Sequence, residues 1–92
     1  MYITIRRYEN AGALADAMVP GQGDINNLMS GIDGFVNYYA TRVGDTMTSI
    51  TICKDKAGCD ESTRLAGIWV KENVKSLPDA PEVSGGPVFI NF

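Results

Sequence analysis

The stretch GFVNYYATRVGDTMTSITIC, residues 34–53, decides the fold, because it has the pattern of two β-strands joined by a tight turn. Residues 35–43 and 46–54 are rich in β-branched and aromatic side chains, which favour strands. Between them, Gly44 and Asp45 form a two-residue connection typical of a hairpin. A central hairpin predicts a β-sheet, and the flanking segments must supply its other strands and its cover.

The first residues of the chain predict a third strand. Over residues 1–8 the side chains alternate, with Ile3 and Ile5 on one face and Thr4 and Arg6 on the other. The isoleucine face is the more apolar, so we expect helices to cover it. Thr4 and Arg6 are then expected on the opposite, open face of the sheet.

Three segments have helical patterns. Residues 11–19 suit a helix that must end at Pro20, and a second short helix is predicted over 24–31. Residues 56–76 carry an apolar stripe with helical period, and Asp55 precedes them as an N-cap.

The end of the chain predicts the last strand. LPDAPEVSGGP, residues 77–87, has the composition of a connector, and VFINF, residues 88–92, that of a strand. The resulting order is β-α-β-β-α-β, the ferredoxin-like motif, in which both helices cover one face of a four-stranded antiparallel sheet. No repeat or linker divides residues 1–92, so the fold class is α+β with one domain.

Composition excludes several kinds of partner and location. The net charge is −3 and no basic stripe is present, which argues against binding of nucleic acid. The opening MYITIRRYEN has neither the apolar core of a signal peptide nor the length of a membrane span. We therefore expect a cytoplasmic protein without membrane contact.

The residue inventory also limits the chemistry. The chain contains no histidine, which excludes Ser-His-Asp and Cys-His sites within one polypeptide, and its two cysteines cannot complete a zinc site. We expect no metal and no cofactor. Cys53 and Cys59 are expected to be reduced thiols, with a local disulfide or redox pair as the alternative.

The open face of the sheet is expected to need a cover, because it carries apolar and aromatic side chains. A second copy of the same sheet is the economical cover, so we expect a homodimer. The space between the two sheets would be a cavity for a small apolar or aromatic ligand. The candidate lining residues are Tyr2, Thr4, Arg6, Asn37, Tyr39, Ser49, Thr51 and Asn91. The alternative is that these side chains satisfy one another across a plain interface.

Three of the candidate residues have competing interpretations. Arg6 would bind an anionic or carbonyl group of a ligand, or else form an ion pair with Glu9 or Asp45. Asn37 would polarise a substrate oxygen, or else satisfy backbone at a bulge. Trp69 is a cavity candidate that is more simply explained as core.

At this level the chain resembles the dimeric α+β barrel superfamily, in particular its small antibiotic-biosynthesis-monooxygenase-like proteins. The resemblance extends over nearly the whole chain, through MYITIRRYE, IDGFVNYY, TSITICKDKAGCDES and AGIWVKENV. It implies a homodimer and, for some members, cofactor-independent oxygenation of aromatic compounds, near polar and tryptophan side chains such as Asn37 and Trp69. The haem-degrading members use a histidine that this chain lacks.

The function expected from this resemblance is a cofactor-independent monooxygenase or isomerase acting on a small apolar or aromatic compound. The alternative is a non-catalytic ligand-binding or structural dimerisation module, so enzyme status is left open at this stage. The break at Pro20, Gly21 and Gly23 departs from the long first helix of the family. It predicts either a lid over the cavity or a surface insertion.

Overall fold

The predicted hairpin is confirmed by a computed structural model that describes residues 1–92. Strand β2 (Phe35–Val43) pairs antiparallel with β3 (Thr46–Cys53). The turn between them contains Gly44 with φ +61°, a left-handed conformation that glycine adopts without strain. The hairpin register follows from this turn, and β2 has one irregularity, near its start.

Strand β1 (Tyr2–Tyr8) lies in the middle of the sheet and pairs antiparallel with β3 on one side and with β4 (Glu82–Pro87) on the other. The strand order is β2-β3-β1-β4. This is the four-stranded antiparallel sheet that the sequence predicts.

The position of the last strand was predicted wrongly, because β4 lies in the segment read as a connector. Tyr2 already pairs with Pro87, so β1 has no residues left to pair with 88–92. Gly85 suits the strand because a Cβ there would lie 2.4 Å from the Ile3 carbonyl oxygen. The apolar tail beyond Pro87 is largely uncovered, and Phe89 is 91% exposed.

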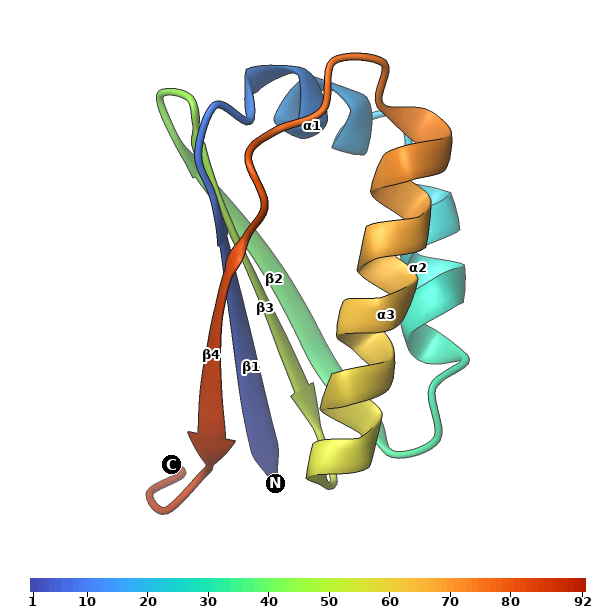
Figure 1. Cartoon of the computed structure of the whole chain (residues 1–92). Helices are drawn as coiled ribbons and strands as arrows, with labels where there is room; N and C mark the ends of the chain where they lie inside the picture. The colour runs from blue at the N-terminus through green and yellow to red at the C-terminus, as the bar shows by residue number, and fades with distance from the viewer.

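Three helices cover one face of the sheet and leave the other face open (Figure 1). They are α1 (Gly12–Met18), α2 (Gln22–Ser30) and α3 (Lys56–Asn73). The side chain of Asp55 caps α3 by accepting a hydrogen bond of 3.0 Å from the Gly58 N–H, as predicted. None of the three is both long enough and apolar enough to cross a membrane.

The helices cover the face opposite to the one predicted. Arg6 and Ser49 are buried beneath them, whereas Ile3, Ile5 and Ile50 are only half-buried on the open face. The assignment failed because it compared the hydropathy of the two faces. Polar side chains such as Arg6 and Ser49 can be buried in the core when they form hydrogen bonds with one another. The more apolar side chains, including Ile3 and Ile5, then lie on the face that the helices do not cover.

At the break between α1 and α2, Gly21 lies against the core, while Pro20 and Gly23 are exposed. Gly21 lies at the turn, and a Cβ there would come within 2.5 Å of the Trp69 ring. Trp69 on α3 is itself 7% exposed. The turn therefore redirects the chain from α1, which packs on β3, to α2, which packs on α3 and β2.

Candidate functional site

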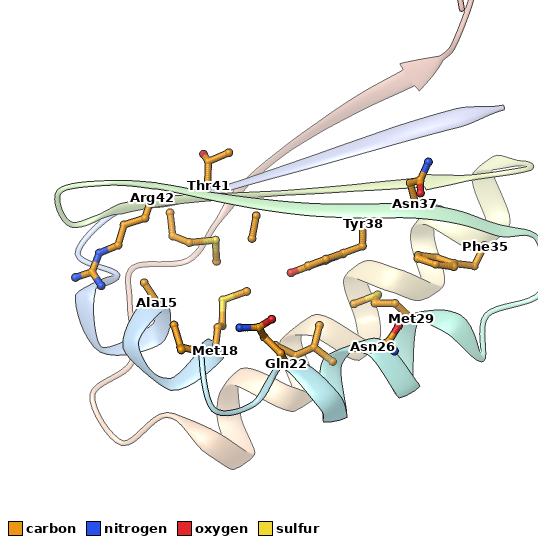
Figure 2. Close-up of a pocket in the computed structure, with 14 residues that line it drawn as sticks. Ala15, Met18, Gln22, Asn26, Met29, Phe35, Asn37, Tyr38, Thr41 and Arg42 are labelled. Carbon is orange, nitrogen blue, oxygen red and sulfur yellow. The ribbon is translucent and has the colours of Figure 1, made fainter.

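A pocket of about 640 Å³ lies between the edge strand β2 and the helices α1 and α2 (Figure 2). Its volume falls in the range of sites for small organic ligands, about 300–1,000 Å³. Nine of its fourteen lining residues are hydrophobic. The lining residues are Ala15, Met18, Val19, Gln22, Ile25, Asn26, Met29, Phe35, Asn37, Tyr38, Ala40, Thr41, Arg42 and Met47.

Four polar side chains face this apolar space, one from the centre of β2, two from α2 and one at the end near the hairpin turn. The Tyr38 ring extends from β2 toward the helices, opposite Gln22 and Asn26 (Figure 2). Arg42 lies at the hairpin end, where its guanidinium contacts Asp16 at 2.6 Å. The pocket thus has an apolar body with separated polar groups, an arrangement that can orient a ligand.

The two β2 residues that the sequence predicted to line a cavity, Asn37 and Tyr39, have side chains directed away from this pocket. Asn37 lies at the rim, and its side chain points away from the pocket, as does that of Thr41 (Figure 2). Tyr39 is 54% exposed on the open face, where it neighbours Ile50 of β3. Asn37 and Tyr39 therefore do not share a cavity with Arg6 within one chain.

Arg6 is fully buried, at 0% exposure, and is held by four hydroxyl oxygens. Its Nε donates to Ser49 Oγ at 3.0 Å and its Nη2 to Thr51 Oγ1 at 2.6 Å, both on the neighbouring strand β3. Its Nη1 donates to Ser62 Oγ at 2.9 Å and to Thr63 Oγ1 at 3.0 Å, both on α3. Every nitrogen of the guanidinium is thus satisfied by neutral groups.

The predicted ion pair of Arg6 is wrong. Glu9 contacts the neighbouring Arg7 at 2.8 Å on the surface, and no carboxylate reaches Arg6. A guanidinium carries its positive charge at all ordinary pH values. The core therefore contains a positive charge that no negative group neutralises.

This charge acts on the tyrosines beside it. Burial raises the pKa of the Tyr38 hydroxyl above its ordinary value, and the positive charge of Arg6 opposes part of that rise. Burial also raises the pKa of Tyr8, and the positive charge of Arg6 again opposes part of the rise. Tyr38 therefore enters the pocket as a protonated hydroxyl at neutral pH.

A second, inner chamber of about 20 Å³ adjoins the pocket on its core side and shares Tyr38 and Met47 with its wall. Ser49 and Trp69 line it. The indole N–H of Trp69 is buried and has no hydrogen-bond partner, which is costly in a protein interior. The chamber is the size of one water molecule or one oxygen-bearing group.

The structure divides the sequence-predicted candidates into two groups. Arg6, Ser49 and Thr51 are brought together beneath the helices, and Trp69 lines the same inner chamber as Ser49. Tyr2, on the same face, is partly buried and packs against the core. Thr4 is also buried on the helix-covered face. The second group consists of Asn37 and Tyr39, which lie on the open face.

Sequence reasoning missed Tyr38, although a signal for it was present. Counting residues outward from the two-residue turn pairs Tyr38 with Thr51 and Tyr39 with Ile50. That count puts Tyr38, rather than Tyr39, on the face of Arg6. The roles of Gln22, Asn26 and Arg42 depend on how α1 and α2 pack, for which the sequence has no comparable signal.

The two cysteines are buried and free, as expected for reduced thiols. Burial raises the pKa of the Cys53 thiol to about 11, and the nearby Cys59 adds to the rise. A thiol with so high a pKa is a poor nucleophile at neutral pH. No three side chains of metal-binding type lie close enough together to hold an ion.

Comparisons with known proteins were made by sequence and by structure. No family model matches the chain, and no curated protein matches its sequence. Among solved structures, the NE2512 protein of unknown function from Nitrosomonas europaea superposes with a TM-score of 0.67 at 16% identity, covering 99% of this chain and 91% of that one.

Two further structures have described ligands or activities. A variant of SnoaB, a cofactor-independent oxygenase from Streptomyces nogalater, has a TM-score of 0.68 at 14% identity, over 98% of this chain and 94% of its own. A variant of MhuD with two manganese protoporphyrin IX molecules per active site has a TM-score of 0.72 at 6% identity, over 100% and 98%. At these identities the likeness establishes a common fold.

Proposed function

We propose, from the fold that this chain shares with the antibiotic-biosynthesis-monooxygenase-like proteins of the dimeric α+β barrel superfamily, that it binds a small apolar or aromatic compound and oxygenates or isomerises it without a cofactor. The observation that carries the proposal is the pocket of about 640 Å³ beside β2. SnoaB, one of the structures with this fold, is described as a cofactor-independent oxygenase.

The lining of the pocket supports this class of ligand. Its predominantly hydrophobic wall favours an apolar body, and the Phe35 and Tyr38 rings offer aromatic contact. Gln22 and Asn26 supply amide groups that can bind one or two oxygen atoms of the compound. Tyr38 is the residue that we assign to proton donation, because its side chain lines the pocket and its hydroxyl stays protonated at neutral pH.

We propose further that a second copy of the chain covers the open face. Three rows of side chains cross that face, and the central row joins Tyr39, Ile50 and Ile5. The half-buried isoleucines and the exposed tail residue Phe89 form apolar surface of the kind that marks an interaction site. In this arrangement Asn37 and Tyr39 contact the partner sheet.

One observation favours the alternative, a module that binds its ligand without turnover. The side chains around the pocket include no carboxylate and no thiol, so a strong general base is absent from the lining. If Tyr38 does not transfer protons, the same pocket serves for binding alone.

Oxygen uptake tests the proposed activity, with a set of hydroxynaphthalenes as substrates and an oxygen electrode as the detector. The Tyr38→Phe variant should lose uptake by about a hundredfold or more, the usual size of a general acid–base contribution. Tyr39→Phe is the matched control, since the adjacent ring lies on the opposite face. Binding of these compounds without uptake above the spontaneous rate, and without any change in their absorption spectra that would report isomerisation, would establish the non-catalytic alternative.

Sedimentation velocity tests the proposed dimer, and native mass spectrometry of gently purified protein adds a test for a retained ligand. Ile50→Lys puts a charge in the centre of the open face and should shift a dimer to monomer. Lys71→Glu is a control at an exposed site on α3, which lies on the helix-covered side of the sheet. A wild-type chain that sediments as a monomer at high concentration would refute the dimer.

A further inference from the structure

The inner chamber has an unusual set of polar groups, because hydrogen-bond donors predominate. Ser49 accepts a hydrogen bond from Arg6 Nε at 3.0 Å, so its hydroxyl proton is not used on Arg6 and is available to the Tyr38 oxygen beside it or to a group in the chamber. Ser49 is 2% exposed and lines the chamber. Its own proton can therefore serve the chamber, with the guanidinium charge directly behind it.

Three more residues with hydrogen-bond donors line the chamber: Trp69, Tyr38 and Tyr8. Trp69 can only donate, and its buried N–H has no partner in the protein. Tyr38 belongs to the wall of the pocket and of the chamber alike, and its raised pKa keeps the hydroxyl protonated at neutral pH. The remaining lining of the chamber is almost wholly hydrophobic, so no carboxylate competes for these donors.

We infer that this chamber is an oxyanion site, and that the ligand of the pocket is a compound that puts an ionised oxygen, a carboxylate or a phenolate, between Tyr38, Ser49 and Trp69. The inference rests on the ligand-binding function proposed above. The chamber has room for one oxygen-bearing group and the pocket has room for the apolar body.

The buried charge gives this site its preference for an anion. Arg6 is surrounded by hydroxyl groups alone, so its field is not cancelled by a carboxylate within the chain. An opposite charge within about 4–6 Å typically lowers the pKa of an acid by roughly one to three. An apolar pocket without such a charge has the reverse effect and favours the neutral acid.

The two kinds of pocket shift the pKa of a bound acid in opposite directions, so this pKa tests the inference directly. A suitable probe is 4-nitrophenol, because its phenolate absorbs visible light. The protein is titrated into the dye over a range of pH, and the pKa of the bound dye is read from its absorbance. We expect that pKa to fall by about one, a tenfold preference for the phenolate. Binding of 4-nitroanisole, which cannot ionise, reports on the pocket alone.

Variants assign the effect to the chamber. Ser49→Ala and Tyr38→Phe each remove one hydroxyl and should abolish most of the fall, whereas Arg6→Met removes the charge. Circular dichroism identifies any variant that has not folded, and the two single-hydroxyl variants keep the test available if Arg6→Met fails. Retention of the full fall in both folded hydroxyl variants would overturn the inference.

The remaining outcomes separate this inference from the proposed function. If the dye binds with an unchanged or raised pKa, the oxyanion site is refuted and the binding pocket stands. Loss of the fall in Arg42→Gln, with Ser49→Ala unaffected, would assign the anion to the outer guanidinium and also refute the chamber. If neither dye nor nitroanisole binds, both proposals fail.

Discussion

Replacing Thr51 by valine tests the role of the buried hydroxyl groups around Arg6. The Thr51 hydroxyl accepts a hydrogen bond of 2.6 Å from Arg6 Nη2, and both residues have 0% exposure. Valine has nearly the same shape as threonine, so the substitution removes the acceptor with little change in packing volume. One N–H of a buried charged group is then left without a partner.

The expected cost follows from these contacts. A hydrogen bond to a charged group contributes roughly 1.5–3 kcal/mol, and the burial of both partners prevents water from replacing it. We therefore expect Thr51→Val to lower the free energy of unfolding by about 2 kcal/mol. For a domain of this size that corresponds to a fall in Tm of roughly 8–16 °C.

Urea unfolding followed by circular dichroism measures the change, at one fixed protein concentration because a dimer would make stability concentration-dependent. Thr48→Val is the matched control, since Thr48 lies on the same strand with its side chain on the open face and should change stability by less than about 0.5 kcal/mol. If the two variants lose equal stability, the hydroxyl groups do not hold Arg6 and the account of the core is wrong.

Three further predictions concern the helices and the thiols. Gly21→Ala should cost about 1–3 kcal/mol through its clash with Trp69, whereas Gly23→Ala, where nothing lies within 4 Å of the added methyl group, should stabilise α2 by roughly 0.5–1 kcal/mol in the same urea assay. Asp55→Ala should lower the free energy of unfolding by about 1 kcal/mol, and Asp55→Asn, which keeps an acceptor, should recover most of it; equal losses would contradict the capping role. The raised pKa of Cys53, about 11 against an ordinary 9.0, means that the folded state holds the thiol proton more tightly. Stability should therefore be complete below pH 9 and fall toward pH 11, and a Cys53→Ala variant with an equally steep fall would refute this assignment.

The sequence was sufficient for the features that depend on local pattern. The β2–β3 hairpin, the Asp55 cap and the order of strands and helices were predicted because turn residues, caps and periodicity act within a few residues. β4 was predicted at residues 88–92 because their side chains have high strand propensity. The strand lies earlier in the chain, where Gly85 allows its backbone to approach that of β1 closely. Propensity could not reveal that β1 was already fully paired.

The face covered by helices could not be predicted by the same means. Hydropathy assigned Ile3 and Ile5 to the core, whereas the core took Arg6 with a complete set of hydroxyl acceptors. Two of those acceptors come from α3, which is 56 or more positions away along the chain. Satisfaction of a polar group over such a separation is visible only after the elements have been assembled.

The alternation of side chains along β2 also limits how this molecule can evolve. Tyr38 contributes to the pocket and Tyr39, its neighbour in the chain, to the open face. Point substitutions at Tyr38 and Tyr39 can therefore change ligand preference or surface recognition one at a time, since each of these two residues serves only one side. An insertion or deletion of a single residue within the strand would exchange the two sets at once. Lineages of this fold should accumulate substitutions in β2 freely and conserve its length.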